Sequence, residues 1–261
     1  MSKLIKWSLV AALAGFLFGF DTVVISGADQ KLQELWNSSD IFHGSVVMAM
    51  ALWGTVFGAI FGGIPTRKYG RRNTLIWIGI FYSISAVGSA LANDPFTFAV
   101  FRFIGGVGVG VSGIAAPAYI SEIAPAKNRG KLVGFYQFNL VTGILVAFLS
   151  NYLLSGIGEN DWRYMMGVEA IPAILYTLLV FSIPKSPRWL YLNNQKDKAE
   201  KIIRDAYSKN DADELIIEIT RDKESSIESE SIFQKKYSFI LTLAFLVAAF
   251  NQFSGINAFL Y

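Results

Sequence analysis

Three charged side chains lie inside long apolar stretches of this sequence, and together they have the chemistry to take up a proton. They are Asp21, Arg102 and Glu169. A charge within a membrane span costs roughly 2.5–3.5 kcal/mol even on insertion-derived scales, so each needs a reason to be there. Two carboxylates and one guanidinium carry a net charge of minus one, and the set becomes neutral when it binds one proton.

The arginine in this set would hold one carboxylate ionised, because a guanidinium does not deprotonate usefully. Burial would favour the neutral form of the other carboxyl. This is the charge change that a proton-coupled step requires. A static ion pair that only joins the three segments is the alternative interpretation.

These charges lie in apolar segments that are long enough to cross a membrane as helices. The apolar runs cover residues 7–27, 44–64, 74–92, 96–118, 130–154, 163–183 and 237–261. About 20 helical residues cross about 30 Å of hydrocarbon. Counted along their helices, Asp21, Arg102 and Glu169 each lie about 9 Å from the same predicted membrane face. The sequence therefore predicts that the three charges share one layer of the membrane.

Glycines recur at four-residue spacing in three of these segments. They are Gly15 and Gly19, then Gly54, Gly58 and Gly62, then Gly106 and Gly110. Small residues at this spacing lie on one helix face and let two helices approach closely in a membrane. The pattern predicts tight packing and does not by itself indicate a function.

Positive charges are distributed unequally between the two sides of the predicted spans. Of the 23 Lys and Arg, 20 fall before the first span or in alternate connections. Cytoplasmic loops carry such an excess, so we expect a multi-pass protein of the plasma (inner) membrane with a cytoplasmic N-terminus. The net charge of +3 is then explained by the basic cytoplasmic loops, and we predict no nucleic-acid partner.

Composition argues against an enzyme or a metalloprotein. The chain has no Cys, and its single His, His43, has no cluster of metal ligands near it in the sequence. We find no catalytic motif and predict no catalytic residue, no metal site and no cofactor.

The order of spans and loops predicts an all-α membrane protein in three parts. Residues 1–186 would form an N-terminal six-helix transmembrane domain, 187–236 a cytoplasmic helical linker, and 237–261 a seventh transmembrane helix. The linker carries ten Lys or Arg and eleven Asp or Glu. Helical patterns over Lys196–Tyr207 and Asp211–Arg221 favour a small bundle, and a solvated mobile linker is the alternative.

Neutral amides also interrupt the apolar segments. They are Gln137 in the fifth span and Asn251, Gln252 and Asn257 in the seventh. Amides both donate and accept hydrogen bonds, which suits an uncharged ligand rich in hydroxyls. A Ser-Gly pair before Asn257 permits a helix break of the kind that transporters use at binding sites. Interhelical hydrogen bonds without a ligand are the alternative.

Six motifs occur in order along the chain. They are GFLFGFDTVVISG at 15–27, RFIGGVGVG at 102–110, PAYISEIAPAKNRG at 117–130, WRYMMGVEAIPA at 162–173, PKSPRWL at 184–190 and NQFSGINAFLY at 251–261. With them the chain resembles the sugar porter family of the major facilitator superfamily. The resemblance implies two six-helix halves, the first built from 3+3 repeats, around a central site for a monosaccharide, either a pentose or a hexose.

The resemblance also implies roles for single residues. Asp21 matches the proton-coupling acid of the proton-driven members, with Arg102 as its partner and Glu169 as the neighbouring acid. Facilitative animal glucose carriers lack the first acid, so its presence favours proton-coupled symport by alternating access. A facilitative sugar uniporter and a non-transporting membrane sugar sensor are the alternatives.

Two further sets of residues match positions with roles in the family. Ile144 stands at a site-lining position that is Gln in the xylose symporter and Ile in glucose carriers, and Asn251 stands where Gln is usual, so the identity of the sugar stays open. The positions that contact or line the sugar site are Phe18, Gln137, Ile144, Asn251, Gln252, Asn257 and Tyr261. The positions that latch the cytoplasmic gate are Arg71, Arg72, Glu122, Arg129 and Arg188.

Two departures from the family pattern reverse a charge at this gate. Arg67 stands where the loop motif often carries Asp, and Lys185 replaces a common Glu. We therefore expect a weaker or differently paired latch. The family continues through five more spans, so we also expect this chain to be a fragment that needs its C-terminal half in order to transport.

Overall fold

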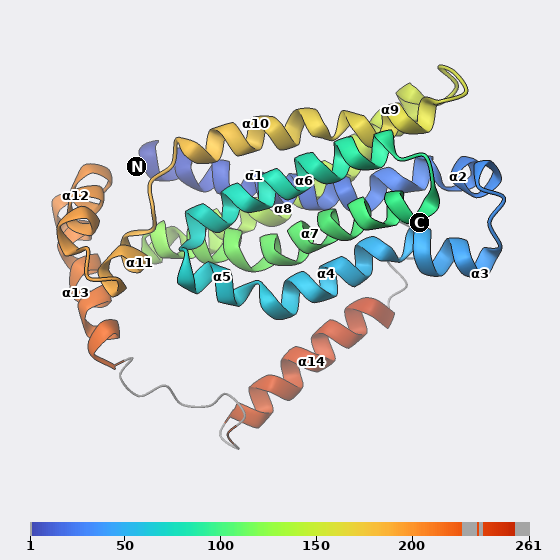
Figure 1. The fold of residues 1–261 in the computed structure, drawn as a ribbon. Coiled ribbons are helices and arrows are strands. Elements are labelled where there is room, and N and C mark those ends of the chain that lie inside the picture. The colour runs from blue at the N-terminus through green and yellow to red at the C-terminus, as the bar shows by residue number, and fades with distance from the viewer. Residues whose placement is uncertain (1, 226–233, 235–236, 254–261) are drawn as a thin grey trace.

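The computed structural model describes residues 2–225, 234 and 237–253, and residues 1, 226–233, 235–236 and 254–261 lie outside this description (Figure 1). All regular elements within the described residues are helical. They are α1 (Ser2–Val24), η1 (Ile25–Gly27), α2 (Asp29–Leu35), α3 (Asp40–Phe42), η2 (His43–Met48), α4 (Met50–Phe61), α5 (Gly63–Lys68), α6 (Arg71–Leu91), α7 (Pro95–Ile123), η3 (Ala126–Asn128), α8 (Arg129–Leu154), α9 (Asp161–Val168), α10 (Ala170–Phe181), α11 (Pro187–Leu192), α12 (Lys196–Ala206), α13 (Lys209–Ser225) and α14 (Ser238–Phe253).

Six helical segments among the described residues are long and apolar enough to cross a membrane, in agreement with the first six predicted runs. They are Lys3–Gly27, Asp40–Phe61, Arg71–Leu91, Pro95–Ile123, Arg129–Leu154 and Asp161–Phe181. Three of the segments are composite: the first joins α1 and η1, the second joins α3, η2 and α4, and the sixth joins α9 and α10. The predicted seventh run is helical over α14, and residues 254–261 of it lie outside the described residues.

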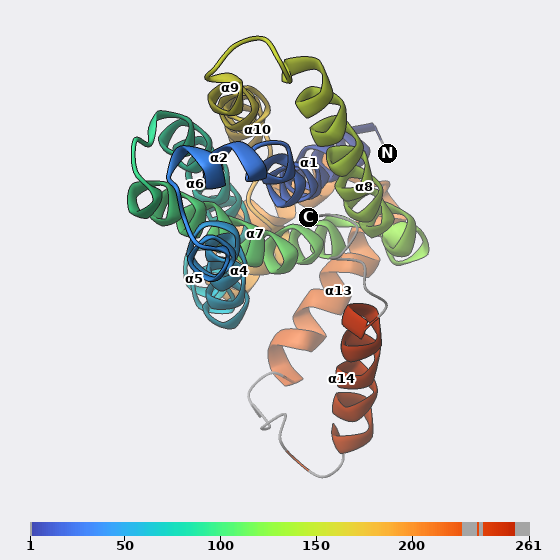
Figure 2. The same cartoon turned by 90° about the vertical axis from the view of Figure 1, so that its right-hand side faces the viewer.

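The first helix runs through the middle of the bundle. Seen from the end that carries α2, α1 lies beside α7 and α8 (Figure 2), and it packs most extensively against α8. Glycines set this close approach. A Cβ atom on Gly19 would lie 2.0 Å from the main-chain oxygen of Leu140, and one on Gly143 would lie 2.0 Å from that of Phe16. The tight packing predicted for Gly19 is therefore present, because only a residue without a side chain fits there.

Two apolar clusters divide the bundle along its length. We call its ends the α2 end, which carries α2 and α3, and the α12 end, which carries α11 to α13 (Figure 1). The cluster near the α2 end includes Phe20, Phe98 and Trp162. Trp36, which follows α2, packs edge-on against two of these rings, 5.4 Å from Phe98 and 6.1 Å from Trp162. This aromatic cap was not predicted from the sequence.

The polar segment after the sixth span forms three short helices. The predicted helical stretches correspond to α12 and α13, and α11 precedes them without having been predicted. Ser186 begins α11, because its side chain accepts a hydrogen bond from the Trp189 backbone amide and Pro187 follows in the first helical position. Trp189, Ile203 and Ile219 lie in one buried cluster that joins the three helices.

Candidate functional site

The three predicted intramembrane charges come together in the interior of the bundle. Arg102 of α7 donates from Nη1 to Oδ1 of Asp21 on α1 at 2.6 Å, and from Nη2 to the Asp21 main-chain oxygen at 2.9 Å. Glu169 lies at the junction of α9 and α10. Each of the three residues is only 1% exposed. The three charges therefore lie together inside the bundle, and their shared depth in a membrane stays a prediction.

Glu169 shares the electrostatic environment of the ion pair, since it interacts with both Asp21 and Arg102. The Oδ2 atom of Asp21 and the Oε1 atom of Glu169 are buried without a hydrogen-bond partner among the described residues. Uncompensated charge is costly at such a site. One guanidinium balances one carboxylate, so the set is neutral only when a proton is bound to the second carboxyl.

The residues predicted to contact a ligand are only partly described. Phe18 on α1 and Ile144 on α8 are half-buried, and Gln137 is exposed on α8. Asn251 and Gln252 lie in α14, and only the backbone of these two residues is described. The remaining two predicted residues, Asn257 and Tyr261, lie outside the described residues. Assembly of the seven predicted residues around one ligand therefore stays a prediction.

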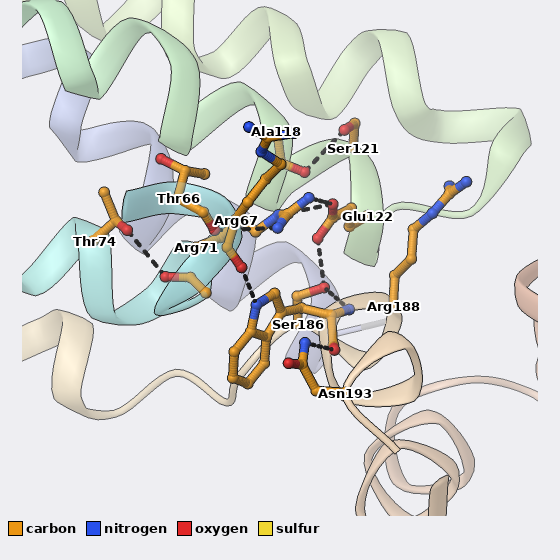
Figure 3. A network of polar contacts seen from close by, with 12 residues as sticks. Thr66, Arg67, Arg71, Thr74, Ala118, Ser121, Glu122, Ser186, Arg188 and Asn193 are labelled. Carbon is orange, nitrogen blue, oxygen red and sulfur yellow. Dashed lines mark hydrogen bonds and ion pairs between the residues drawn. The ribbon is translucent and has the colours of Figure 1, made fainter. Parts of the chain in front are cut away.

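A second polar site lies at the α12 end and is built around Glu122 of α7 (Figure 3). Arg71 donates from Nε to Glu122 Oε1 at 2.9 Å, and its Nη2 lies 2.7 Å from the same oxygen. Arg71 Nη1 also donates to the main-chain oxygen of Thr66 at 3.1 Å. The Ser186 hydroxyl donates to Glu122 Oε2 at 2.5 Å. One carboxylate thus joins α6 and α7 to the start of α11.

Trp189 contacts both residues that depart from the family pattern, Arg67 and Lys185. Its indole Nε1 donates to the main-chain oxygen of Arg67 at 2.8 Å, so this contact does not depend on which side chain stands at position 67. Lys185 places its ammonium 5.3 Å from the centre of the Trp189 ring, a cation–π geometry that no glutamate could form. Gly70, with φ of +86°, passes so close that a Cβ atom there would lie 2.9 Å from the ring.

Among the described residues, the five predicted gate residues contact several different partners. Arg71 pairs with Glu122, as described above. Arg129 and Arg188 instead share Glu218 of α13, at 3.6 Å and 4.0 Å. Arg72 donates from Nη2 to the main-chain oxygen of Phe181 at 2.8 Å and so holds the end of α10. Sequence reasoning missed Glu218 because nothing in a charged linker singles out one acid among eleven.

These two carboxylates differ in burial, and we expect Glu122→Gln to destabilise the protein more than Glu218→Gln does. The Glu122 side chain is 9% exposed and has a charged partner, so losing its charge should cost about 1.5–3 kcal/mol. The Glu218 side chain is 40% exposed, and its longer ion pairs should contribute less than about 1 kcal/mol. Thermal unfolding of both variants in one detergent checks this order. Equal losses would contradict it.

Comparison with known proteins identifies the family. Residues 7–261 match the sequence profile described as "Sugar (and other) transporter". The chain is 33% identical over 291 residues to the D-xylose-proton symporter of Escherichia coli K12, covering 100% of this chain and 59% of the symporter. It is 32% identical over 273 residues to the arabinose-proton symporter of Bacillus subtilis 168, covering 100% of this chain and 58% of that protein.

The structure agrees with the sequence comparison. The xylose transporter XylE from E. coli, in a partially occluded inward open conformation, superposes with a TM-score of 0.89 at 33% identity, over 99% of this chain and 66% of XylE. The chain spans about half the length of the relatives that it matches. It belongs to the sugar porter family of the major facilitator superfamily, and it is a multi-pass membrane protein of a transporter family, not an enzyme.

Proposed function

We propose that the protein containing this chain carries a monosaccharide across the plasma membrane together with a proton, by alternating access. The observation that supports this most strongly is the buried set of Asp21, Arg102 and Glu169, with two carboxylates and one guanidinium. Two similar proteins are named as proton symporters of xylose and of arabinose. The sugar of this protein is therefore proposed only as a pentose or hexose.

The coupling would follow from the charge of the set. With both carboxyls ionised the set carries a net negative charge inside an apolar bundle, and binding of one proton removes it. A bound proton shifts the balance between outward- and inward-facing states only if the two states bind it with different affinity. Such a difference requires that the surroundings of Asp21 and Glu169, each 1% exposed here, change between the two states.

The proposal also covers the division of the chain into parts, its orientation and its cytoplasmic gate. Residues 1–186 form the first transmembrane half, 187–236 the cytoplasmic linker and 237–261 the first helix of the second half. The α12 end faces the cytoplasm together with the N-terminus. Ion pairs that form in one state and break in the other would then latch the cytoplasmic gate. The Arg71–Glu122 pair and the shared acid Glu218 supply such pairs.

The test is to add sugar to weakly buffered vesicles that contain the complete gene product and to record external pH. Symport is expected to make the external medium more alkaline when xylose, arabinose, glucose or galactose is the substrate. A uniporter would take up labelled sugar with no change in pH, and a sensor would bind sugar without flux. Competition among the four sugars then identifies the substrate. Without any coupled pH change the symport proposal fails.

A further inference from the structure

An apolar groove opens at the surface of the bundle between α4 and α6. Both helices pack on α7 and make little contact with each other, so Val107 and Val111 of α7 form part of the floor. The volume of the groove is about 240 Å³. A helix is about 10–12 Å across, so a further helix does not fit into this space, whereas a single hydrocarbon chain does.

Aromatic rings form the two walls of the groove. Phe57 and Phe61 of α4 have ring centres 4.6 Å apart, and those of Trp77 and Phe81 of α6 are 6.4 Å apart. Phe57, Phe61 and Trp77 are each about half exposed. Exposed apolar side chains are ordinary in membrane-spanning segments, so the walls alone do not identify a ligand. The length of the groove and the charge at its mouth are more specific.

The groove is about as long as one membrane leaflet is thick. Tyr69 lines it at the α12 end, in the connection between the second and third candidate spans (Figure 1). Phe81, the last residue of α6 that lines the groove, comes ten residues after Arg71, where α6 begins. Ten residues rise about 15 Å, which is half of a hydrocarbon core about 30 Å thick. The groove therefore matches one acyl chain of a lipid in the leaflet at the α12 end.

A positive charge lies at the mouth of the groove. Lys68 is exposed, and its ammonium lies 5.4 Å from the centre of the Tyr69 ring. Lys68 comes three residues after Pro65, which lines the groove, so both lie on the same face of α5. Within the described part of the chain, no carboxylate pairs with Lys68, whereas Arg71 is paired with Glu122. The Lys68 ammonium can therefore bind an anion at the membrane surface.

We propose that this groove binds one anionic phospholipid, with an acyl chain between α4 and α6 and its phosphate on the Lys68 ammonium. The apolar walls match the chain, the length matches one leaflet, and the cation matches the charge of the headgroup. A zwitterionic phospholipid offers the same chain without a net negative charge. The site is separate from the charge set and from the predicted sugar contacts, because none of its lining residues belongs to either. It does not depend on the proposed symport.

The test measures lipid contact at Trp77, whose indole is fluorescent. The complete gene product in a neutral detergent is titrated with phosphatidylglycerol or phosphatidylcholine that carries bromine at mid-chain, because bromine quenches indole fluorescence on contact. The Trp77 signal is the difference between the unmodified protein and Trp77→Phe. We expect half-quenching at an about fivefold lower concentration of phosphatidylglycerol, which is roughly the contribution of one lysine near an anionic lipid surface.

Lys68→Gln and Arg67→Gln are a matched pair of variants. Both side chains are exposed and each substitution removes one positive charge, but Arg67 comes two residues after Pro65 and lies on a different face of α5. Lys68→Gln should abolish the preference for phosphatidylglycerol and leave half-quenching by phosphatidylcholine within about twofold. Arg67→Gln should keep the preference. The Trp189 hydrogen bond survives in that variant, because it uses the main-chain oxygen of residue 67.

Each other outcome would overturn the lipid site. Equal quenching by the two lipids in the unmodified protein would show contact with ordinary bilayer lipid only. Equal loss of the preference in both variants would assign it to the general positive charge of this surface. If neither lipid quenches Trp77, another part of the protein covers the groove. Loss of the preference in Lys68→Gln alone supports the site. No sugar or proton movement is measured, so failure here leaves the proposed function untouched.

Discussion

Asp21→Asn is expected to abolish sugar accumulation against a gradient while sugar exchange continues. Asn keeps the shape of the side chain and can still accept the Arg102 Nη1 hydrogen bond, which is 2.6 Å long in the structure. Asn cannot bind a proton, however. The charges that remain are those of Arg102 and Glu169, which cancel when no proton is bound. A coupling acid that no longer titrates leaves substrate exchange possible and uncouples it from the proton gradient.

The measurement compares labelled-sugar accumulation under an imposed pH gradient with counterflow in the same vesicles. Asp29→Asn is the control, because Asp29 pairs with His43 at 2.7 Å near the α2 end, away from the charge set. It should leave both rates unchanged. Accumulation that survives intact in Asp21→Asn would remove Asp21 from the coupling role.

A second substitution at the same position separates coupling from folding. Asp21→Ala leaves the Arg102 guanidinium, 1% exposed, without its carboxylate. Removing one partner of a buried ion pair typically costs about 3–5 kcal/mol. We therefore expect this variant to be recovered in low yield, whereas Asp21→Asn should be recovered normally.

The sequence predicted the membrane helices and the charge set well, for a simple physical reason. Hydrocarbon thickness and helix rise fix both the length of a span and the depth of a residue along it. The cost of burying charge then requires that charges at equal depth be near one another. These constraints brought Asp21, Arg102 and Glu169 together correctly, although their positions in the chain are far apart.

Other features could not be predicted because they depend on how helices are oriented around their axes. Depth says nothing about which acid Arg129 meets, and its contact with Glu218 of α13 follows only from the fold of the linker. Depth also does not predict that Arg72 donates to the main-chain oxygen of Phe181 at the end of α10, and its role in the gate stays a prediction.

The glycine spacing gives a prediction about folding with a large expected effect. Gly106 lies where α7 crosses α4, and a Cβ atom there would lie 2.0 Å from the main-chain oxygen of Ala51. Backbone atoms cannot move aside as a flexible side chain can, so Gly106→Ala must push the two helices apart. We expect a loss of about 1–3 kcal/mol or more, because overpacking a tight contact forces backbone shifts.

Gly113→Ala on the same helix is the matched control for this effect. Gly113 is exposed, and a Cβ atom there would meet nothing within 4 Å. Ala favours a helix over Gly by up to about 1 kcal/mol, so Gly113→Ala should be neutral or slightly stabilising. Thermal unfolding of both variants in detergent measures the difference. Of the two glycines, only Gly106 lies against the backbone of α4. An equal loss of Tm in both variants would therefore show that the close approach of α4 is not the reason for glycine at position 106.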